Sequence, residues 1–404
     1  MLGKSSIWTK DFIAICLSSF FLFMNFYTLA TTLPVFVIDH FHGSQQQIGL
    51  VLTVYVIAAV LLRPLAGRWA DRFGKKKIAV VSLALFLACT VMYFGARSLP
   101  LLLVLRTLHG GSYGMASTAA GAVAADLVPA SRKGEGIGYY SMFMSLAMVV
   151  GPFVGLTVTA HSSFTVLFAM CCAFSLLSLL CGAWMRQPRG EPAVKQSDAG
   201  AGGLRLGNLI EPGALPVSLA GLVLAFSYSS LTAFISVYAK ELGFEHAASY
   251  FFICFAAMIV LPRPFIGKIF DKFGEHVLVY PGVLLFIAGM MLLSHAHSAA
   301  LFLCSGAVIG LGHGAIIPCF QTLAVKASPS HRSGLATGTF FLLFDLGYGL
   351  GCYVLGVVAE HTHYHTMYTI SGALAFFTAI IYYILHHRKQ IAPPALPKRS
   401  VMNR

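Results

Sequence analysis

Long apolar stretches alternate with short polar ones along most of the chain. Each apolar stretch is close to the ~20 residues that a helix needs to cross the ~30 Å hydrocarbon core of a bilayer. The pattern therefore predicts twelve membrane-spanning helices in two sets of six. The predicted spans are Ile13–Ile38, Ile48–Gly67, Ile78–Phe94, Leu99–Ala125, Ile137–Ala160, Phe164–Trp184, Leu215–Tyr238, Ser249–Gly267, Val277–Ser294, Ala299–Ala324, Leu335–Val358 and Met367–Leu385.

The amino-acid composition excludes a soluble protein. Of the 404 residues, 57% are hydrophobic and 10% are charged, whereas ordinary soluble domains carry roughly 25% charged residues. No soluble core could hold so many apolar side chains. The fold class that we expect is an all-α, multi-pass membrane protein surrounded by a lipid bilayer.

The placement of lysine and arginine predicts the orientation in the membrane. With twelve crossings both termini lie on one side, and 22 of the 27 basic residues fall on that side. Because cytoplasmic loops are enriched in basic residues, we expect both termini in the cytoplasm. The basic residues occupy several short segments, so the net charge of +13 indicates no nucleic-acid partner.

One charged turn occurs twice. The stretch "LLRPLAGRWADRFGKKK" at Leu61–Lys77 is echoed by "VLPRPFIGKIFDKFGEH" at Val260–His276. Twelve columns aligned from Arg63 and Arg263 contain six identities, at an offset of 200 residues. At the same offset further residues recur without a gap, namely Gly110, Gly114, Ala124, Pro129, Arg132, Gly134, Gly138 and Gly151.

This ungapped register is typical of a duplicated transporter with parallel halves. It divides the chain into a six-helix bundle at 1–185, a cytoplasmic linker at 186–214, a second six-helix bundle at 215–387 and a cytoplasmic tail at 388–404. The linker is rich in proline, glycine and charge, which is typical of a flexible tether.

Three motifs resemble those of the major facilitator superfamily. "GRWADRFGKKK" resembles its cytoplasmic loop motif between helices two and three, and "RTLHGGSYG" resembles its helix-four motif, with Arg106 as the buried arginine. "GPFVG", with Gly151, Pro152 and Gly155 as hinge and packing residues, is similar to the end of the helix-five motif of drug:proton antiporters. That motif is incomplete, because Ala147 and Leu156 stand where the family usually has glycine.

The resemblance implies a conformational latch at the duplicated turn. In the family the loop aspartate belongs to a charge cluster, which corresponds here to Asp71, Lys75 and Asp126. In the second copy the last two become Glu275 and Lys326, so both signs reverse together. We therefore predict an ion pair in each half, the alternative being four solvated charges. The full latch set is Gly67, Asp71, Arg72, Gly74, Lys75, Asp126, Asp271, Glu275 and Lys326.

Polar residues inside the spans are candidates for a substrate path. Arg106, His109, Tyr113 and Ser117 follow spacings of three, four and four, so they share one helix face. Such a stripe has to face a cavity or a polar partner, because lipid cannot satisfy it. The resemblance places the first, fourth, seventh and tenth helices along a central path. The candidates on the other three are Asn25, Tyr27, Ser227, Tyr228, His313 and Gln321.

Asp345 stands apart among the fourteen acidic residues, since it lies about ten residues from each end of its span. A carboxylate at that depth costs a few kcal/mol unless it is paired or protonated. We predict that Asp345 couples transport to protons; the alternative is a permanent ion pair with an arginine such as Arg63. Arg63 and Arg263 lie one turn from the cytoplasmic ends of their helices, where they either snorkel or pair between the halves.

Eight of the fifteen histidines fall in the expected external loops, three of them in "EHTHYH". The extended spacing lacks the fixed geometry of a metal site, so no metal is predicted, and external pH sensing and simple solvation stay open. No phosphate-cradling GxxxxGK[ST] motif, hydrolase triad or zinc spacing is present, so we expect neither an enzyme nor a cofactor.

Three functions remain compatible with the sequence. The leading hypothesis is a proton-coupled exporter of small amphiphilic or hydrophobic compounds, working by alternating access as a monomer in the bacterial cytoplasmic membrane. The second is a proton-coupled symporter or exporter of a polar metabolite such as a sugar, a peptide or an anionic chelate held by Arg106. The third is a non-transporting receptor or scaffold.

Overall fold

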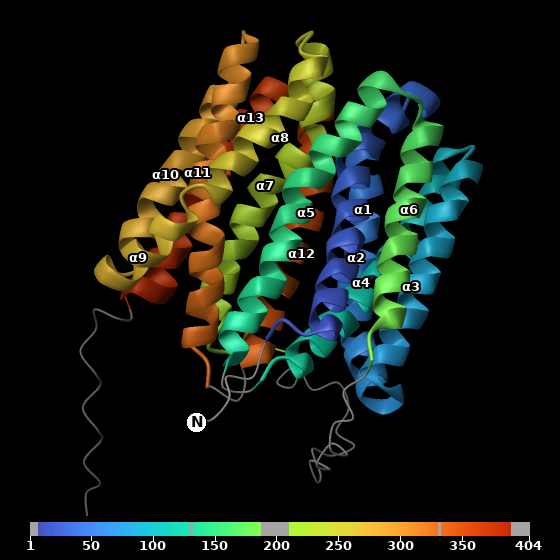
Figure 1. The fold of residues 1–404 in the computed structure, drawn as a ribbon. Helices are drawn as coiled ribbons and strands as arrows, with labels where there is room; N and C mark the ends of the chain where they lie inside the picture. The colour runs from blue at the N-terminus through green and yellow to red at the C-terminus, as the bar shows by residue number, and fades with distance from the viewer. Residues whose placement is uncertain (1–6, 130–131, 187–209, 330–332, 389–404) are drawn as a thin grey trace, which may run out of the picture.

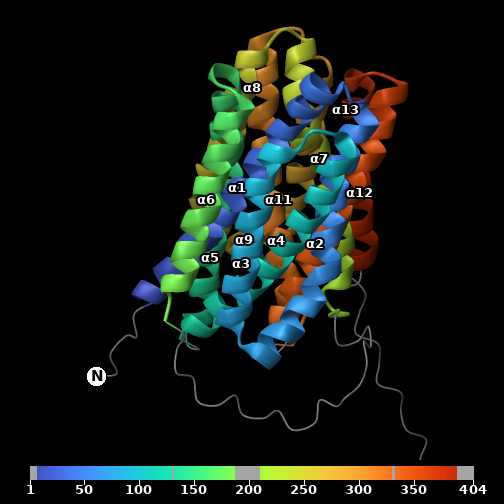
Figure 2. The same ribbon diagram turned by 90° about the vertical axis from the view of Figure 1, so that its right-hand side faces the viewer.

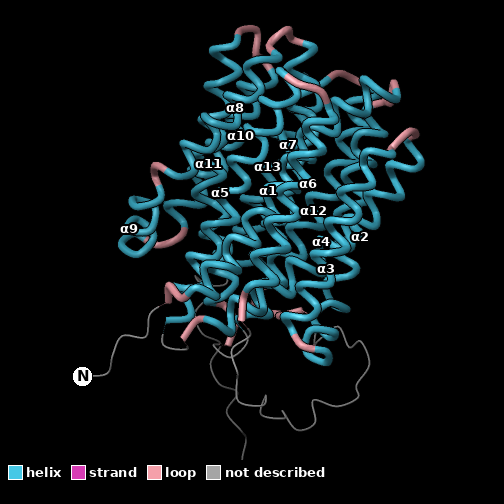
Figure 3. Tube along the Cα trace, turned by 45° about the vertical axis from the view of Figure 1, so that its right-hand side comes forward, coloured by secondary structure: helices cyan, strands magenta, loops and turns pink. Residues whose placement is uncertain are grey.

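The computed structural model of the chain describes residues 7–129, 132–186, 210–329 and 333–388. Most of the predicted linker and tail lies outside these residues, as do the side chains of Asp71, Arg263 and Asp271. The described residues form long helices joined by short loops, without a β-strand (Figure 3). The predicted all-α fold is confirmed.

The first set of helices follows the predicted pattern. A bond of 3.2 Å from Phe12 N to Thr9 Oγ1 begins the first helix, and Ser44 and Gln47 form a capping box that begins the second. Gly74, at φ 100°, turns the chain directly from the second helix into the third. The six helices are α1 (Lys10–Phe41), α2 (Gln45–Phe73), α3 (Lys75–Met92), α4 (Leu99–Leu127), α5 (Lys133–His161) and α6 (Phe164–Trp184) (Figure 1).

The second set differs from the prediction in its second span. The stretch predicted at Ser249–Gly267 is two helices, because Pro262 has no backbone N–H to continue the first of them. The helices are α7 (Leu215–Glu241), α8 (Glu245–Val260), α9 (Arg263–Phe273), α10 (His276–Ser294), α11 (Ala299–Lys326), α12 (Ser333–His361) and α13 (Tyr364–Tyr382), the last continuing as the π-helical turn Tyr383–His387.

Among the described residues, ten helices are long and apolar enough to cross a membrane. They are α1, α2, α3, α5, α6, α7, α10, α11, α12 and α13. The helix α8 is not among them because it has only 16 residues. In α4, Arg106, His109 and several glycines lower the mean hydropathy. For α4 and α8, membrane crossing stays a prediction.

The duplication is visible in the packing contacts. An added Cβ at Gly110 on α4 would lie 2.0 Å from the carbonyl oxygen of Tyr55 on α2. At Gly310 on α11 it would lie 2.1 Å from the carbonyl oxygen of Phe255 on α8. Both residues of the contact are displaced by 200 positions. The contacts of Gly114 with Ala59 and of Gly314 with Ile259 repeat the relationship.

The two sets pack side by side through α1 with α7, α2 with α12 and α5 with α8. One end of the bundle carries the first turn of α1, the π-helical end of α13 and the turns α2–α3 and α9–α10; we call it the terminal end (Figures 1 and 2). At the opposite end, Lys240 Nζ lies 2.8 Å from Asp39 Oδ1, and Ser236 Oγ donates to the carbonyl of Thr31 at 2.9 Å.

Candidate functional site

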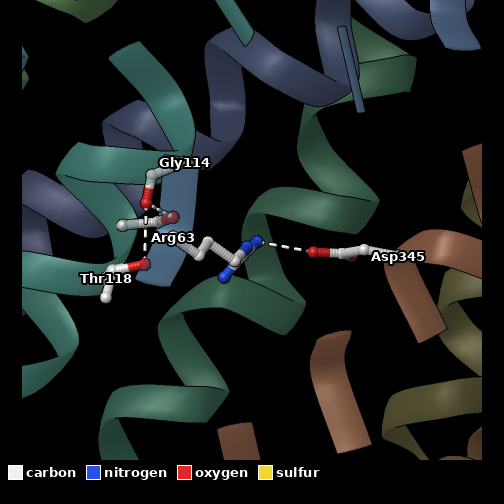
Figure 4. Close-up of polar contacts among 5 residues, drawn as sticks. Arg63, Gly114, Thr118 and Asp345 are labelled. Atoms are coloured by element: carbon white, nitrogen blue, oxygen red, sulfur yellow. Dashed lines mark hydrogen bonds and ion pairs between the residues drawn. The ribbon is translucent and has the colours of Figure 1, made fainter. Parts of the chain in front are cut away.

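The ion pair between Arg63 and Asp345 joins the two sets of helices (Figure 4). Arg63 Nη2 on α2 lies 2.5 Å from Asp345 Oδ2 on α12. The two side chains are 21% and 25% exposed, although both lie well inside their helices. In the same view, Thr118 Oγ1 of α4 donates a hydrogen bond of 2.7 Å to the carbonyl of Gly114. The structure thus brings the candidate proton carrier into contact with the arginine suggested as its partner.

Small residues let α2 and α12 approach closely enough for this pair. An added Cβ at Gly49 would lie 2.2 Å from the carbonyl oxygen of Cys352, so the two backbones touch there. One turn further along, Thr53 Oγ1 donates to the carbonyl of Gly349 at 2.6 Å. A glycine on each helix therefore sets a short separation between them, and the side chain of Arg63 spans what remains.

Aromatic rings from both halves meet near the pair. Tyr27 on α1 and Tyr113 on α4 lie close enough to Asp345 to interact with it electrostatically. Phe26 stacks on Tyr113 with 5.1 Å between ring centroids, and it lies 6.3 Å from the ring of Tyr348 on α12. Tyr27 and Tyr113, both predicted to border a path, therefore lie where the halves meet.

Arg106 is completely buried within the first half. Its Nε donates to the carbonyl of Val51 at 3.2 Å and its Nη1 to the hydroxyl of Tyr93 at 3.4 Å. Its guanidinium carbon lies 3.9 Å from the centroid of the Tyr55 ring, a cation–π contact. These partners belong to α2 and to the short 3-10 turn Tyr93–Gly95 that follows α3.

A chain of hydrogen bonds continues from Arg106 through the first half. The Tyr93 hydroxyl lies 3.0 Å from His109 Nδ1, and His109 Nε2 lies 3.1 Å from Thr90 Oγ1. Thr90 Oγ1 is 3.0 Å from Ser175 Oγ, which accepts from Asn25 Nδ2 at 2.8 Å. The chain links α4, α3, α6 and α1, and every member of it is buried.

Asn25, Arg106 and His109 have partners inside the first half, and their role in a substrate path stays a prediction. In this conformation all three turn into the first half and bind neighbouring helices. The physical reason is that a polar group at membrane depth is satisfied as well by a polar neighbour as by a water-filled path. Helical spacing shows which residues share a helix face, but it does not determine whether that face meets a polar neighbour or a water-filled path.

The candidates of the second half also lie mostly inside it. Tyr228 on α7 stacks on His313 of α11 with 4.6 Å between ring centroids. Ser227 accepts a hydrogen bond at its carbonyl from Ser371 Oγ at 2.9 Å, and its side chain is buried. Gln321 lies nearer the terminal end of α11 and is partly exposed. Buried Ser227, Tyr228 and His313 therefore pack within one half instead of bordering a path in this conformation.

The latch residues of the first half lie at the terminal end. Lys75 Nζ, at the start of α3, lies 2.6 Å from Asp126 Oδ2, near the end of α4. Arg72 lies over the exposed ring of Phe73, 5.2 Å from its centroid. An added Cβ at Gly67 would meet no described atom within 4 Å, so no close packing among the described residues requires a glycine there in this conformation. The side chain of Asp71 lies outside the described residues.

In the second half the corresponding charges have other neighbours. Glu275 Oε1 lies 3.4 Å from Nε2 of His386, in the π-helical turn that follows α13. Lys326 Nζ lies over the ring of Phe270, 4.5 Å from its centroid. Glu275, Lys326 and His386 line one small pocket together with Leu323 and Ala327. The pairing of Glu275 with Lys326 stays a prediction.

The glycines of the "GPFVG" motif pack α5 against α1. An added Cβ at Gly151 would lie 2.9 Å from Tyr27 Cβ, and at Gly155 it would lie 2.9 Å from Thr28 Cγ2. Thr28 Oγ1 also donates to the carbonyl of Gly151 at 3.0 Å. Pro152 lies inside α5. The motif therefore packs α5 closely against the part of α1 that carries Tyr27 and Thr28.

The polar candidates have partners that were not predicted from the sequence, namely Tyr55, Tyr93, Thr90, Ser175 and His386. One signal was present: a fully buried arginine in a membrane helix requires several polar or aromatic neighbours, and the adjacent spans contain tyrosines that can meet this need. The predicted absence of a metal centre concerned the external histidines. In the described part of the chain, His, Cys, Asp and Glu form no group of three or more that could hold a metal ion.

Comparison with known families defines the class of protein. The family model described as Major Facilitator Superfamily matches residues 15–351. The chain belongs to this family of multi-pass membrane transporters, whose members bind small-molecule substrates.

Several curated relatives are similar over most of their length. The chain is 24% identical over 372 residues to Multidrug resistance protein 1 of Bacillus subtilis (strain 168), covering 89% of this chain and 93% of that protein. It is 25% identical over 364 residues to the multi-drug resistance efflux pump PmrA of Streptococcus pneumoniae, covering 86% and 89%. It is 21% identical over 377 residues to the staphylopine export protein of Staphylococcus aureus, covering 90% and 94%.

Solved structures share the fold. A bacterial homolog of the human lysosomal transporter Spinster, in an inward-facing and occupied conformation, matches with a TM-score of 0.79 at 16% identity, covering 95% of this chain and 98% of that chain. The nucleoside transporter NupG matches with a TM-score of 0.72 at 16% identity, covering 93% and 99%.

Proposed function

We propose that this transporter is a proton-coupled exporter of small amphiphilic or hydrophobic compounds that works by alternating access. The observation that carries the proposal is the Arg63–Asp345 ion pair, which joins the two halves inside the membrane-spanning helices. A charge pair there is stable only while both charges are present. Protonation of Asp345 removes one of them and would release α12 from α2.

The energetics suit a carboxylate in this place. Moving one proton inward down a potential of about 100 mV supplies roughly 2.3 kcal/mol, enough to hold about a fifty-fold substrate gradient. Breaking an ion pair of low exposure costs a comparable amount when no partner replaces the lost one. One proton on Asp345 is therefore sufficient to shift the balance between two arrangements of the halves.

The proposal includes a topology and a location. We place the terminal end in the cytoplasm, because it carries Arg68, Arg72 and the run Lys75–Lys77. Twelve crossings then put both termini in the cytoplasm, with the protein acting as a monomer in the bacterial cytoplasmic membrane. The division into two six-helix domains is supported by the repeated glycine contacts at a displacement of 200 residues.

The names of the relatives support export but differ in what they say is exported. Two of them are described as a multidrug resistance protein and a multi-drug resistance efflux pump. The staphylopine export protein supports a second candidate, export of a polar metabolite. A receptor or scaffold without transport activity is the third. Arg63 and Asp345 are joined by one contact and are both partly exposed, which suits an ion pair that opens and closes during transport better than a permanent structural one.

Substrate-dependent proton movement tests the proposal. Purified protein is reconstituted into liposomes that contain a pH-sensitive dye, and ethidium is added as an amphiphilic cation. Exchange of ethidium for protons supports the leading candidate. Proton movement with a polar solute such as a nucleoside, in place of ethidium, supports the second. Binding without any proton or solute flux would leave the receptor as the remaining candidate and overturn the proposal.

A further inference from the structure

Histidine and tyrosine side chains join the start of α10 to the π-helical turn that follows α13. The rings of His276 and His387 are stacked, with 3.7 Å between their centroids and an angle of 19° between their planes. The hydroxyl of Tyr382 lies 2.8 Å from Nδ1 of His276, and the hydroxyl of Tyr280 lies 2.7 Å from Nδ1 of His387. The ring of Tyr383 meets that of His387 edge-on, with 5.6 Å between centroids. Both hydrogen bonds therefore join α10 to α13 and its turn.

The hydrogen bonds of the stacked pair suit neutral rings. Both distances fit a tyrosine hydroxyl that donates to Nδ1 of a neutral imidazole. A protonated imidazole carries N–H groups on both nitrogens, so it donates where a neutral one accepts. Two protonated rings at a centroid distance of 3.7 Å would also repel each other, because neighbouring like charges disfavour each other's ionisation. The stack is therefore stable while the rings are neutral, and a second proton opposes it.

Charged groups lie close to the stack. Glu275 Oε1 is 3.4 Å from Nε2 of His386, and this attraction is strongest when the histidine is protonated. Lys326 of α11 lines one small pocket with these two residues, and α11 also brings the buried thiol of Cys319 to this end. Acid therefore strengthens the contact between Glu275 and His386 and weakens the stack beside it.

The other elements packed at this end contribute charges that do not change near neutral pH. Lys272 of α9 and Arg388, which directly follows the turn, are exposed. Two further charged side chains of α9 lie outside the described residues, namely Lys268 and Asp271. The parts of α7 and α12 nearest the terminal end, residues 215–226 and 333–344, contain no histidine or charged residue. Among the described residues, histidine is therefore the type whose charge changes near neutral pH at this contact.

The sequence of the first half does not repeat this cluster, although α3 packs against α6 there as α10 packs against α13. At a displacement of 200 residues, the positions of the two stacked histidines and their two tyrosine partners are occupied by Lys76, Gln187, Val80 and Gly182. Lysine keeps its charge throughout the physiological pH range, and the other three do not titrate. Packing of such a helix pair thus requires neither histidine nor tyrosine, which indicates a separate role for them in the second half.

We propose that the stacked pair of His276 and His387 is a pH switch at the cytoplasmic end, which holds α13 on α10 while both rings are neutral and releases it when the cytoplasm becomes acidic. The inference rests on the proposed function and topology and names the regulation of transport. Because alternating access moves each half as a unit, releasing α13 from α10 slows the cycle. An exporter that admits protons thereby limits its own acidification of the cell.

Thermal melting in detergent and ethidium counterflow in proteoliposomes test the switch. Both are measured at about pH 7.5 and about pH 5.5, one unit on either side of the ordinary histidine pKa, with equal pH across the membrane. His276→Asn and His387→Asn each keep an acceptor near the position of Nδ1 but remove a titratable ring. On acidification the wild type should lose at least about 2 °C more in melting temperature than either variant. Its counterflow should slow at least about two-fold, and that of the variants should not.

The comparison of single and double variants distinguishes a coupled pair from two independent groups. Repulsion needs both rings, so the two single variants and the double variant should lose the acid sensitivity to the same extent. His386→Asn removes the attraction to Glu275 that acid strengthens, and it should enlarge the acid-induced loss. His297→Asn removes an exposed histidine at the opposite end of the bundle and should behave like the wild type.

A wild-type pH dependence of melting in folded His276→Asn and His387→Asn overturns the inference. So do losses of acid sensitivity that add between the single variants, because they indicate independent titration. Counterflow that responds to pH equally in the wild type and both variants overturns the regulatory role, even where melting differs. The single variants decide the outcome if the double variant does not fold. Absence of ethidium movement at either pH would overturn the proposed function, while the melting temperatures still decide for or against the switch.

Discussion

Lys75 and Asp126 form a direct charge pair, 2.6 Å from nitrogen to oxygen, that ties the start of α3 to the end of α4. Their side chains are 31% and 50% exposed, so water and salt weaken the attraction. The pair lies beside Gly74, where the chain turns directly from α2 into α3. The pair thus links α3 to α4 next to the turn that joins α2 to α3.

Reversing both charges of this pair should preserve transport better than reversing either one. In a double-mutant cycle of Lys75→Asp and Asp126→Lys we expect a coupling energy above about 0.5 kcal/mol. The measurement is the rate of gradient-driven efflux together with the melting temperature of each variant. Losses that simply add would mean that the contact does not stabilise the functional state.

The corresponding cycle of Glu275 and Lys326 should give a smaller coupling. Glu275 has a neighbour in His386, and Lys326 lies over Phe270, so neither depends on the other alone. Replacing His386 with alanine should raise the coupling, because Glu275 then has fewer alternatives. A second-half coupling equal to that of Lys75 and Asp126 before any change at His386 would contradict this asymmetry.

Asp345→Asn should abolish uphill export driven by a pH gradient while the protein stays folded. Asparagine keeps the shape and accepts a hydrogen bond, but it cannot carry the proton and leaves Arg63 without its counter-charge. We expect efflux against a gradient to fall at least about ten-fold, and exchange of substrate between equal concentrations to persist. Gradient-driven efflux at the wild-type rate in a well-folded variant would exclude the coupling role.

Arg106→Gln should destabilise the first half and leave the charges of Arg63 and Asp345, where the two halves meet, unchanged. The substitution removes the bonds to Val51 and Tyr93 and the contact with the Tyr55 ring. Breaking a buried network by removing one partner costs on the order of 3 kcal/mol, which should appear as a lower melting temperature in detergent. Arg106→Lys should be intermediate, because lysine keeps the charge but not the planar fork. Arg97→Gln, in an exposed loop, serves as the control and should melt like the wild type.

Gly151→Ala should lower stability through a clash between α5 and α1. The added Cβ would lie 2.9 Å from Tyr27 Cβ and 3.2 Å from the carbonyl of Met24, so a backbone has to move. Overpacking of this kind costs about 1–3 kcal/mol. Gly138→Ala on the same helix is the matched control: its Cβ would meet no described atom within 4 Å, and the alanine favours the helix. Equal melting temperatures of the two variants would show that the close packing at Gly151 does not matter.

The lengths of the apolar runs determined the class of fold, because a bilayer tolerates helices and excludes unpaired backbone. The internal repeat also followed from the sequence alone. Its glycines reappear as the contacts of Gly110 and Gly310 with helices displaced by the same 200 residues. A break such as the one at Pro262 was harder to place, since a proline within an apolar run can bend a helix as well as end it.

Charge gave partial information about the site. The cost of a carboxylate at membrane depth pointed to Asp345, and the presence of an arginine within an apolar span pointed to Arg63. The two are the pair that the structure brings together. Opposite charges deep in the membrane have few alternatives to each other, which is why this contact could be anticipated from residue types.

Only the tertiary structure decided where the other polar residues turn. Helical spacing placed Arg106 and His109 on one face, but the rotation of α4 against α2 and α3 made that face an internal one. Asn25 likewise meets Ser175 of α6, a residue 150 positions away. The sequence shows that each of these polar side chains in the membrane requires a partner. Which partner it reaches depends on the packing angles between neighbouring helices throughout the bundle.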